Sequence, residues 1–252
     1  MHCESFLPRV TKTIAVATPA NAVPASAPTP PNMFVGTSGW AYPTWKPGFY
    51  PADVPPRAFL HFYAACLTSV EVNYTFRTLP TPAQLQGWLE ATPPNFRFSF
   101  KAPQRITHFQ RLRESNATLA EFLELPSFAA NPHLQLAFEF RHPSWFTDAT
   151  YDILRRHNAA LCVAESDDLV TPDVATANFR CYRLRRNGGY SSTELTTFVR
   201  RFTKLALDTE LYIYFKHEDE PTGALNATAF LAAASIFTTA KSTSPSKAAG
   251  RK

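Results

Sequence analysis

The chain has 252 residues, 45% of them hydrophobic, with 25 Lys and Arg against 20 Asp and Glu, a formal charge of +5. This apolar content is sufficient for a folded core and excludes a chain that is disordered throughout. No apolar run reaches the roughly 18 residues of a membrane span, so we expect no membrane contact. Residues 34–240 carry equal numbers of positive and negative side chains, so the excess lies at the two ends. This distribution argues against a nucleic-acid partner.

The two ends differ in composition from the rest of the chain. Residues 1–32 are rich in Ala, Pro and Thr, and we interpret them as a flexible extension. A secretory signal is the alternative, because Arg9 and Lys12 precede a mildly apolar stretch, although Thr18 and Pro19 break it. Residues 241–252 are predicted to form a disordered basic tail, whose only alternative role is weak, nonspecific nucleic-acid attachment. One domain over residues 33–240 remains.

Four cysteines, Cys3, Cys66, Cys162 and Cys181, are far apart and form no C-x-x-C pair. This spacing predicts neither a zinc cluster nor a disulfide framework. Cys162 and Cys181 lie in apolar runs, where a free cysteine usually behaves as a small buried hydrophobe. A cytoplasmic location is therefore expected.

Short apolar runs rich in β-branched and aromatic residues alternate with segments of helical period. Thr81-Pro82 and the capping box of Ser191 and Glu194 each predict the start of a helix. The alternation predicts an α/β fold with a parallel sheet, either open and doubly wound or closed into a TIM-type barrel. The predicted strands are 33–36, 69–76, 97–101, 135–141, 160–165, 180–185 and 211–215.

Polar side chains recur at alternate positions towards the carboxyl ends of several predicted strands. A parallel strand covered on both faces is expected to be almost entirely apolar, so these positions need a separate explanation. If the strands close into a barrel, the polar face points inward and its carboxyl ends converge at the mouth. The result is a mixed-charge pocket with a small positive excess; a satisfied internal ion network is the alternative. The charged residues expected to converge are Glu71, Lys101, Glu139, Arg141, Glu165, Arg183 and Lys216.

Four stretches of the sequence carry a family resemblance: Gly36–Trp40, Val70–Asn73, Phe98–Pro103 and Phe138–Trp145. In this order and combination they resemble the YecE-like family, known as domain of unknown function 72, over about residues 34–232. The resemblance implies a TIM-type barrel of one domain. It implies no established activity.

The chain also departs from that family. Residues 106–134 are too few for the helix, strand and helix that members carry before the Glu139 strand, so about one β/α unit is missing. Either Leu123–Leu125 forms a very short strand, or the barrel is open there, with an exposed edge that favours self-association or instability. Lys216 stands where the family tends to have asparagine, which raises the positive excess of the pocket.

The polar residues are assigned two sets of roles. Glu71, Glu139 and Glu165 are candidate acid/base groups, joined by His142, which follows the Glu139 strand and is alternatively scaffold. A mixed-charge pocket beside a glycine-containing turn predicts binding of a carboxylate, phosphate or sugar phosphate, with aromatic side chains that stack on the ligand or only pack over the mouth. The candidate substrate-binding residues are Ser38, Trp40, Tyr42, Asn73, Lys101, Arg141, Arg183, Tyr214 and Lys216.

No cofactor is expected. The acid/base candidates together with Asp167 also supply ligands for a divalent metal, but the interleaved cations compete for them. We therefore expect a cytoplasmic barrel protein that binds a small anionic compound, such as a phosphorylated sugar or a nucleotide-like molecule, with hydrolase or isomerase activity. The alternative is a non-catalytic binding or remnant protein whose buried charges only hold the barrel. The sequence makes no prediction of oligomeric state.

Overall fold

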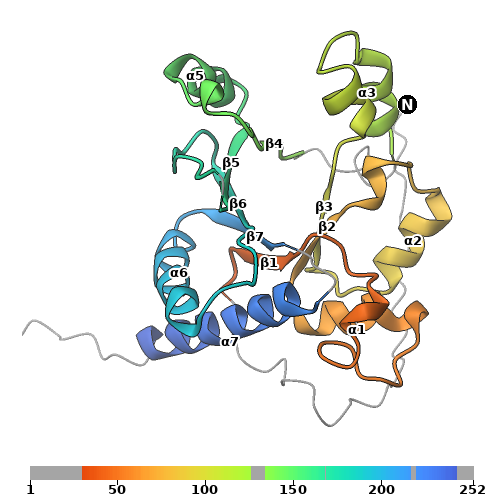
Figure 1. Cartoon of the computed structure of the whole chain (residues 1–252), viewed down its shortest axis with the longest axis vertical. Coiled ribbons are helices and arrows are strands. Elements are labelled where there is room, and N and C mark those ends of the chain that lie inside the picture. Colours follow the sequence, from red (N-terminus) through yellow and green to blue (C-terminus); the bar gives the residue numbers. More distant parts are fainter. Residues whose placement is uncertain (1–29, 126–133, 168, 217–219, 243–252) are drawn as a thin grey trace, which may run out of the picture.

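A computed structural model describes residues 30–125, 134–167, 169–216 and 220–242. Nearly all of the predicted extension and tail therefore lies outside the described residues. Strands and helices alternate along the described chain (Figure 1). The strands are β1 (Met33–Thr37), β2 (Ser69–Val72), β3 (Arg97–Phe100), β4 (Ala137–Phe138), β5 (Ala160–Glu165), β6 (Phe179–Leu184) and β7 (Glu210–Phe215).

The helices begin where local sequence signals predict them. Thr81 accepts from the backbone N–H of Gln84, whose side chain accepts in turn from the Thr81 N–H, and Ser191 and Glu194 form the same capping box. None of the described helices is long and apolar enough to cross a membrane. The α-helices are α1 (Phe59–Cys66), α2 (Pro82–Glu90), α3 (Asn116–Leu123), α5 (Asp148–Arg156), α6 (Ser192–Leu205) and α7 (Thr222–Ser242). Short 3₁₀ turns cover Pro43–Trp45, Pro56–Ala58, Tyr74–Phe76 and Pro143–Trp145, and a π turn covers Arg105–Phe109.

All pairings between the described strands β1–β7 are parallel, which confirms the α/β prediction. One sheet has the order β1-β7-β6-β5-β4, and β2 pairs with β3 in a second sheet. The two sheets meet at β1 and β2, where the Gly39 N–H donates to the Glu71 carbonyl at 2.8 Å. Gly36 permits this approach, because a Cβ there would lie 1.8 Å from the Ser69 carbonyl oxygen.

β2 and β4 are much shorter than predicted and β3 is shorter by one residue, and the sheet is interrupted between β3 and β4. β2 ends at Val72 because Tyr74–Phe76 turns into a 3₁₀ helix, and β4 has two residues. The prediction of a very short strand at Leu123–Leu125 is wrong, since α3 continues to Leu123 and ends in a turn. Among the described residues β3 and β4 do not pair, so an opening separates them. Closure into a barrel stays a prediction.

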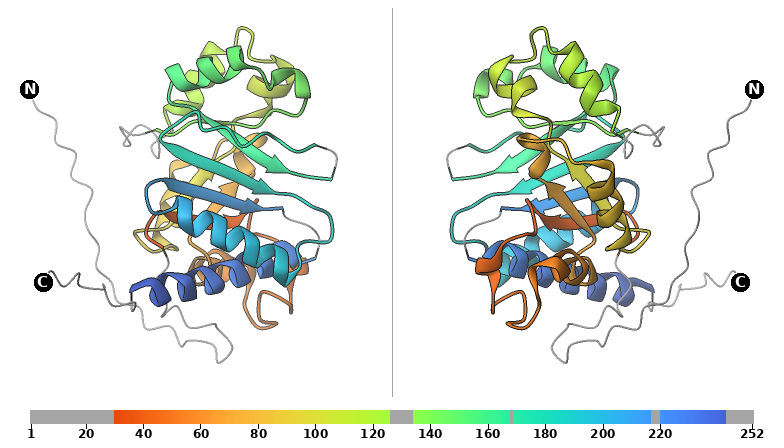
Figure 2. Two further views of the ribbon diagram at one scale, coloured as in Figure 1. Left: turned by 90° about the vertical axis from the view of Figure 1, so that its left-hand side faces the viewer. Right: turned by 90° about the vertical axis from the view of Figure 1, so that its right-hand side faces the viewer.

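The main core lies on one face of the sheet. Val35, Ile213 and Phe215 are buried against helices α1, α6 and α7. Val199 of α6 and Phe230 of α7 belong to the same cluster. Figure 2 shows α6 and α7 lying along this side of the strands. Because successive strand residues point to opposite faces, the residues that alternate with these apolar ones face away from the three helices. That second face carries most of the polar side chains that the sequence singled out, among them Arg183, whereas Glu165 lies in register with Leu184 on the helix-covered face.

Candidate functional site

Arg183, on β6, lies at the centre of a group of charged side chains. Its Nη2 donates to Glu71 Oε2 at 3.0 Å and to Ser38 Oγ at 2.9 Å, and its Nη1 donates to a carboxylate oxygen of Glu139. The Ser38 hydroxyl also donates to Glu71. The side chains of Arg183, Glu71 and Glu139 are only 12–13% exposed. One guanidinium on β6 therefore joins Glu71 of β2 with Ser38 and Glu139, which directly follow β1 and β4.

Glu139 gathers two further cations at the end of β4. Its Oε1 accepts from Arg185 Nη1 at 2.7 Å and from Arg141 Nε at 3.2 Å. Arg185 was not among the predicted site residues, although its position two residues after Arg183 on the same polar face was a usable signal. Arg141 is 62% exposed, so it is the cation most open to solvent.

Lys101, at the end of β3, completes the group. Its Nζ lies 4.4 Å from the centre of the Phe76 ring, and its charge interacts with those of Glu71, Glu139, Arg141 and Arg183. We call Ser38, Glu71, Lys101, Glu139, Arg141, Arg183 and Arg185 the Arg183 cluster. Four cations meet two carboxylates in it, a formal charge of +2 in a body whose net charge is zero.

Burial and the neighbouring charges act in opposite directions on these groups. Burial is the largest influence on the pKa of Glu139 and raises it, but Arg183, Arg185 and Arg141 together outweigh burial and hold that pKa below its usual value. Burial likewise opposes the charged form of Arg183, but Glu71 and Glu139 outweigh it and raise the pKa of Arg183. The pKa of Lys101 is lowered, first by burial and then by Arg183 and Arg141, against the attraction of Glu71.

The loop after β1 forms one wall of the cluster. Gly39 has φ +84°, a left-handed conformation that favours glycine, and the Tyr42 hydroxyl donates to the Ser38 carbonyl at 3.0 Å. Burial raises the pKa of Tyr42, and the charge of Glu71 raises it further. A hydrogen bond with Asn73 partly offsets this by lowering the same pKa. Trp40 is half-buried, with its ring edge-on to Trp88 at 5.4 Å. These aromatic rings are engaged in packing beside the cluster.

Tyr214 belongs to the buried interior below the cluster. Its ring is 3% exposed, and its hydroxyl is hydrogen-bonded to Ser69 Oγ at 2.8 Å and to Ser99 Oγ. Burial raises the pKa of Tyr214 well above its usual value, against the hydrogen bonds with both serines. Cys162 and Cys181 are buried in the same region, with their sulfur atoms 3.4 Å apart, as the sequence predicted for small buried thiols. Tyr214, Cys162 and Cys181 therefore form one buried cluster.

Glu165 and Lys216 form contacts apart from the Arg183 cluster. Glu165 accepts from Arg186, which also donates to Glu194, and Lys216 Nζ donates to Asn187 Oδ1 at 2.6 Å. The expected convergence of Glu165 with Glu71 and Glu139 is therefore wrong. The physical reason is strand alternation: Glu165 pairs in register with Leu184, on the face opposite Arg183.

His142 acts locally in the structure. Its Nδ1 accepts from the Ser144 backbone N–H at 3.2 Å and contacts Ser144 Oγ at 2.8 Å, at the start of the 3₁₀ turn Pro143–Trp145. Within the described ranges no hydrogen bond joins it to a carboxylate, so this contact favours the scaffold alternative. Among the same residues no three His, Cys, Asp or Glu side chains are grouped closely enough to hold a metal ion.

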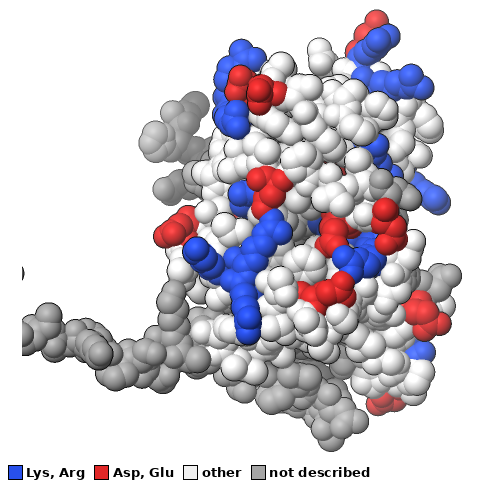
Figure 3. Space-filling view, turned by 60° about the vertical axis from the view of Figure 1, so that its left-hand side comes forward, with Lys and Arg blue, Asp and Glu red and all other residues white. Residues whose placement is uncertain are grey.

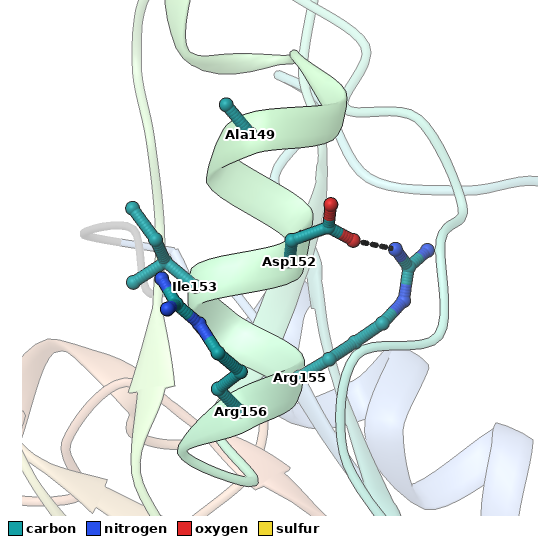
Figure 4. Close-up of a pocket in the computed structure, with 5 residues that line it drawn as sticks. All are labelled: Ala149, Asp152, Ile153, Arg155 and Arg156. Atoms are coloured by element: carbon teal, nitrogen blue, oxygen red, sulfur yellow. Dashed lines mark hydrogen bonds and ion pairs between the residues drawn. The ribbon is translucent and has the colours of Figure 1, made fainter.

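Two smaller groups of charges lie elsewhere on the described surface: Asp173 pairs with Arg180 and Arg201, and Arg186 pairs with Glu165 and Glu194. Figure 4 shows a shallow depression along α5, where Arg155 Nη1 donates to Asp152 Oδ1 at 2.8 Å, with Ala149, Ile153 and Arg156 beside them. All five residues come from one helix, so this is a solvated helix flank. Figure 3 shows one larger group of basic side chains left of centre with acidic side chains beside it, and smaller mixed groups elsewhere on that face.

Sequence comparison with known families gives a direct match. The family described as "Protein of unknown function DUF72" matches residues 34–131 and 124–249, which together cover most of the chain. The chain belongs to the DUF72 family. This confirms the family resemblance read from the four motifs, and like the motifs it brings no established activity.

Individual relatives agree with this assignment. The DUF72 chain is 34% identical over 92 residues to the UPF0759 protein YecE of Escherichia coli strain K12, a match over 36% of this chain and 31% of YecE. It therefore aligns with about a third of the length of that relative. A crystal structure of a DUF72 family protein from Thermotoga maritima has a TM-score of 0.60 at 25% identity, over 79% of this chain and 97% of that chain. One from Enterococcus faecalis has a TM-score of 0.60 at 16% identity, over 79% and 95%, which supports the fold alone.

Proposed function

We propose that this DUF72 chain binds a small anionic compound, of the phosphorylated sugar or nucleotide-like class, at the Arg183 cluster. The observation that carries the proposal is the charge balance, because four cations surround two carboxylates that are mostly buried. A surplus of positive charge at reduced dielectric is costly without a counter-ion, and a bound anion removes that cost.

Two side chains are placed to make the contacts. Arg141 is 62% exposed and, among the described residues, bonds to Glu139 alone through Nε, so its other N–H groups are open to a ligand. The ammonium of Lys101 lies over the Phe76 ring and is half-buried, which suits a point contact with the same anion. Arg183 and its two carboxylates are the scaffold that orients this pair.

The Arg183 cluster suits binding better than acid catalysis. A general acid needs a pKa near the working pH, whereas the arginines around Glu139 hold its pKa below the usual value. Glu139 therefore suits a permanently ionised group that positions cations. Hydrolase or isomerase activity would need its acid from elsewhere, and Glu71, beside Ser38, is the remaining carboxylate of the cluster.

We further propose that the two sheets are parts of one interrupted TIM-type barrel. The strand order β4-β5-β6-β7-β1, followed through the Ser38–Glu71 bridge by β2 and β3, is consistent with a barrel sequence that lacks one unit. In such a barrel the cluster lies at the carboxyl ends of the strands, the end at which barrel enzymes bind their substrates.

The test is ligand-induced thermal stabilisation of the full chain. Inorganic phosphate, a hexose 6-phosphate and a nucleoside monophosphate are the probes, with the uncharged hexose and nucleoside as controls. At 100 times the dissociation constant a ligand stabilises by about 2.7 kcal/mol, which corresponds to roughly 5–10 °C for a domain of this size.

The matched variants are Arg141→Ala and Arg155→Ala, two arginines that are both solvent-exposed. Arg141→Ala is expected to abolish most of the shift, and Arg155→Ala to leave it unchanged. If no phosphorylated probe stabilises the unaltered chain, the anion site is wrong and the alternative, an ion network that only holds the fold, is favoured.

A further inference from the structure

The loop between β3 and α3 carries a concentration of exposed positive charge. It begins shortly after Lys101 with the π turn Arg105–Phe109 (Figure 1), and we call residues 105–114 the arginine loop. With Glu114 as its one carboxylate, the arginine loop has a formal charge of +2. Its cations are all exposed, and none of the ion pairs among the described residues includes them: Arg105, Arg111 and Arg113.

A ring contact connects the arginine loop to the Arg183 cluster. The ammonium of Lys101 lies 4.4 Å from the centre of the Phe76 ring, and the His108 ring meets the same ring edge-on at 5.1 Å. Phe76 therefore lies between a cation of the cluster and the π turn of the loop. The arginine loop thus borders the cluster at Lys101, one of the two side chains proposed to contact the anion.

The arginine loop is anchored near its two ends and exposed between them. Ile106 and Ser115 are buried, whereas the side chains of residues 107–114 are exposed or half-buried. Its two large apolar side chains at the surface, Phe109 and Leu112, are 72% and 57% exposed. A segment with so few buried contacts can move at little cost in free energy, as the lids of ligand sites do.

The backbone of the arginine loop has an uncommon conformation. Arg111, Leu112 and Glu114 have φ of +50°, +64° and +47°, in the left-handed region that residues other than glycine seldom adopt. The Leu112 N–H donates to the Ile106 carbonyl at 2.9 Å, which holds the loop against the π turn. Residues in such conformations cluster at ligand clamps and switch segments. Because few side-chain contacts offset the strain here, a ligand that supplies contacts can shift the loop to another shape.

We propose that the arginine loop closes over the ligand of the Arg183 cluster and binds a second phosphate group of that ligand. This inference rests on the proposed anion site. One phosphate monoester carries a charge of about −1.5 to −2 near pH 7, which the +2 of the cluster balances without the loop. A second phosphate takes up the +2 of the arginine loop, and arginine binds phosphate oxygens through two parallel hydrogen bonds. The ligand class is thereby narrowed to compounds with two phosphate groups.

The first test compares pyrophosphate with inorganic phosphate by calorimetric titration of the full chain in a buffer that contains a metal chelator. We expect pyrophosphate to bind about tenfold or more tightly than phosphate, the gain expected from one further charge-assisted contact. Arg111→Gln combined with Arg113→Gln is expected to remove this preference and to leave the affinity for phosphate unchanged. Glutamine adopts positive φ no more readily than arginine, so the change removes charge without relieving strain.

The matched control is Arg155→Gln combined with Arg156→Gln, which removes two exposed arginines from α5. We expect it to keep the preference for pyrophosphate, and loss of the preference there too would show a general effect of net charge and overturn the inference. If both probes bind with equal affinity, or if the loop variant keeps the preference, the arginine loop has no part in an anion site that still holds. If neither probe binds, the anion site itself is wrong, and the inference falls with it.

The second test follows closure by limited trypsin digestion, with the cleavage sites identified by peptide mass spectrometry. Arg111 of the loop is compared with Arg57, which is exposed in the 3₁₀ turn Pro56–Ala58. We expect saturating pyrophosphate to slow cleavage after Arg111 by about tenfold or more, because cleavage follows the population of the open loop, and to leave cleavage after Arg57 unchanged. Equal slowing at both sites, or none at Arg111 while pyrophosphate is bound, refutes closure of the loop.

Discussion

Replacing Arg183 by methionine tests the centre of the site. The substitution keeps most of the apolar stem but removes the hydrogen bonds to Glu71, Glu139 and Ser38. Glu139 keeps Arg185 and Arg141, and Ser38 keeps Glu71, so the largest loss falls on Glu71. Removing one partner of a buried ion pair costs about 3–5 kcal/mol. We expect the lower end of that range, about 3 kcal/mol, because Glu139 remains paired.

The assay is urea unfolding followed by tryptophan fluorescence at pH 7. Arg155→Met is the control, since Arg155 pairs with Asp152 at a similar distance on an exposed helix, and such pairs contribute about 0.5 kcal/mol or less. If Arg183→Met lowers the free energy of unfolding no more than Arg155→Met does, the cluster does not stabilise the fold and the argument from its burial fails.

The pH dependence of this difference has a defined sign. The pKa of Glu139 is lowered in the folded chain, so its stabilising contribution is present above the unfolded pKa of about 4.3 and is lost as the pH falls through the lower folded value. Arg183→Met weakens that contribution. The part of the difference in unfolding free energy that comes from Glu139 is therefore expected to be full at pH 7 and to shrink below about pH 4.

Three further predictions concern the fold. Gly36→Ala is expected to destabilise the chain by several kcal/mol, because the new Cβ would clash with the backbone of Ser69. Gly87→Ala, in open space on α2, is expected to stabilise the chain by about 0.5–1 kcal/mol. If both variants change the free energy of unfolding in urea in the same direction, the close approach of β1 and β2 is contradicted. Ser191→Ala removes the cap of α6 and is expected to cost about 1 kcal/mol by the same assay, and an unchanged midpoint would show that the cap is dispensable. Cys162 and Cys181 are buried, and the pKa of Cys162 is raised first by its hydrogen bond with Cys181 and then by burial. Both thiols are expected to resist labelling by a maleimide at pH 8 until urea is added. Labelling of either one in the folded chain, detected by mass spectrometry of peptides, would refute their burial.

The sequence predicts those features that depend on neighbouring residues. The N-cap at Thr81 and the capping box at Ser191 form as predicted, and at Thr81 the side chain of Gln84, three residues on, completes a capping box as well. The alternation in β6 and β7 is equally local, because Arg183 and Tyr214 each follow an apolar residue that faces the helices. Parallel strands and most of the cluster could therefore be derived from spacing alone.

Features that depend on register between strands were harder to predict. The β5 strand is buried on both faces, so its sequence has no polar and apolar contrast to show which way Glu165 points. Only its pairing with β6 places Glu165 beside Leu184, away from Arg183. Arg185 was missed for a related reason: its contact with Glu139, which follows β4 and lies 46 residues earlier, exists only once the strands are arranged in space.

The division of the charges into two groups changes which residues matter for the proposed ligand. The sequence assigned Lys216 to the pocket as an additional cation, but its ammonium contacts Asn187 in the loop after β6, while Arg185 occupies the place beside Glu139. The positive excess of the Arg183 cluster is therefore counted without Lys216. It rests on Lys101, Arg141, Arg183 and Arg185, which lie on β6 or shortly after β3, β4 and β6. The sheet is interrupted between β3 and β4, yet Arg183 links residues on both sides of the interruption through Glu71 and Glu139.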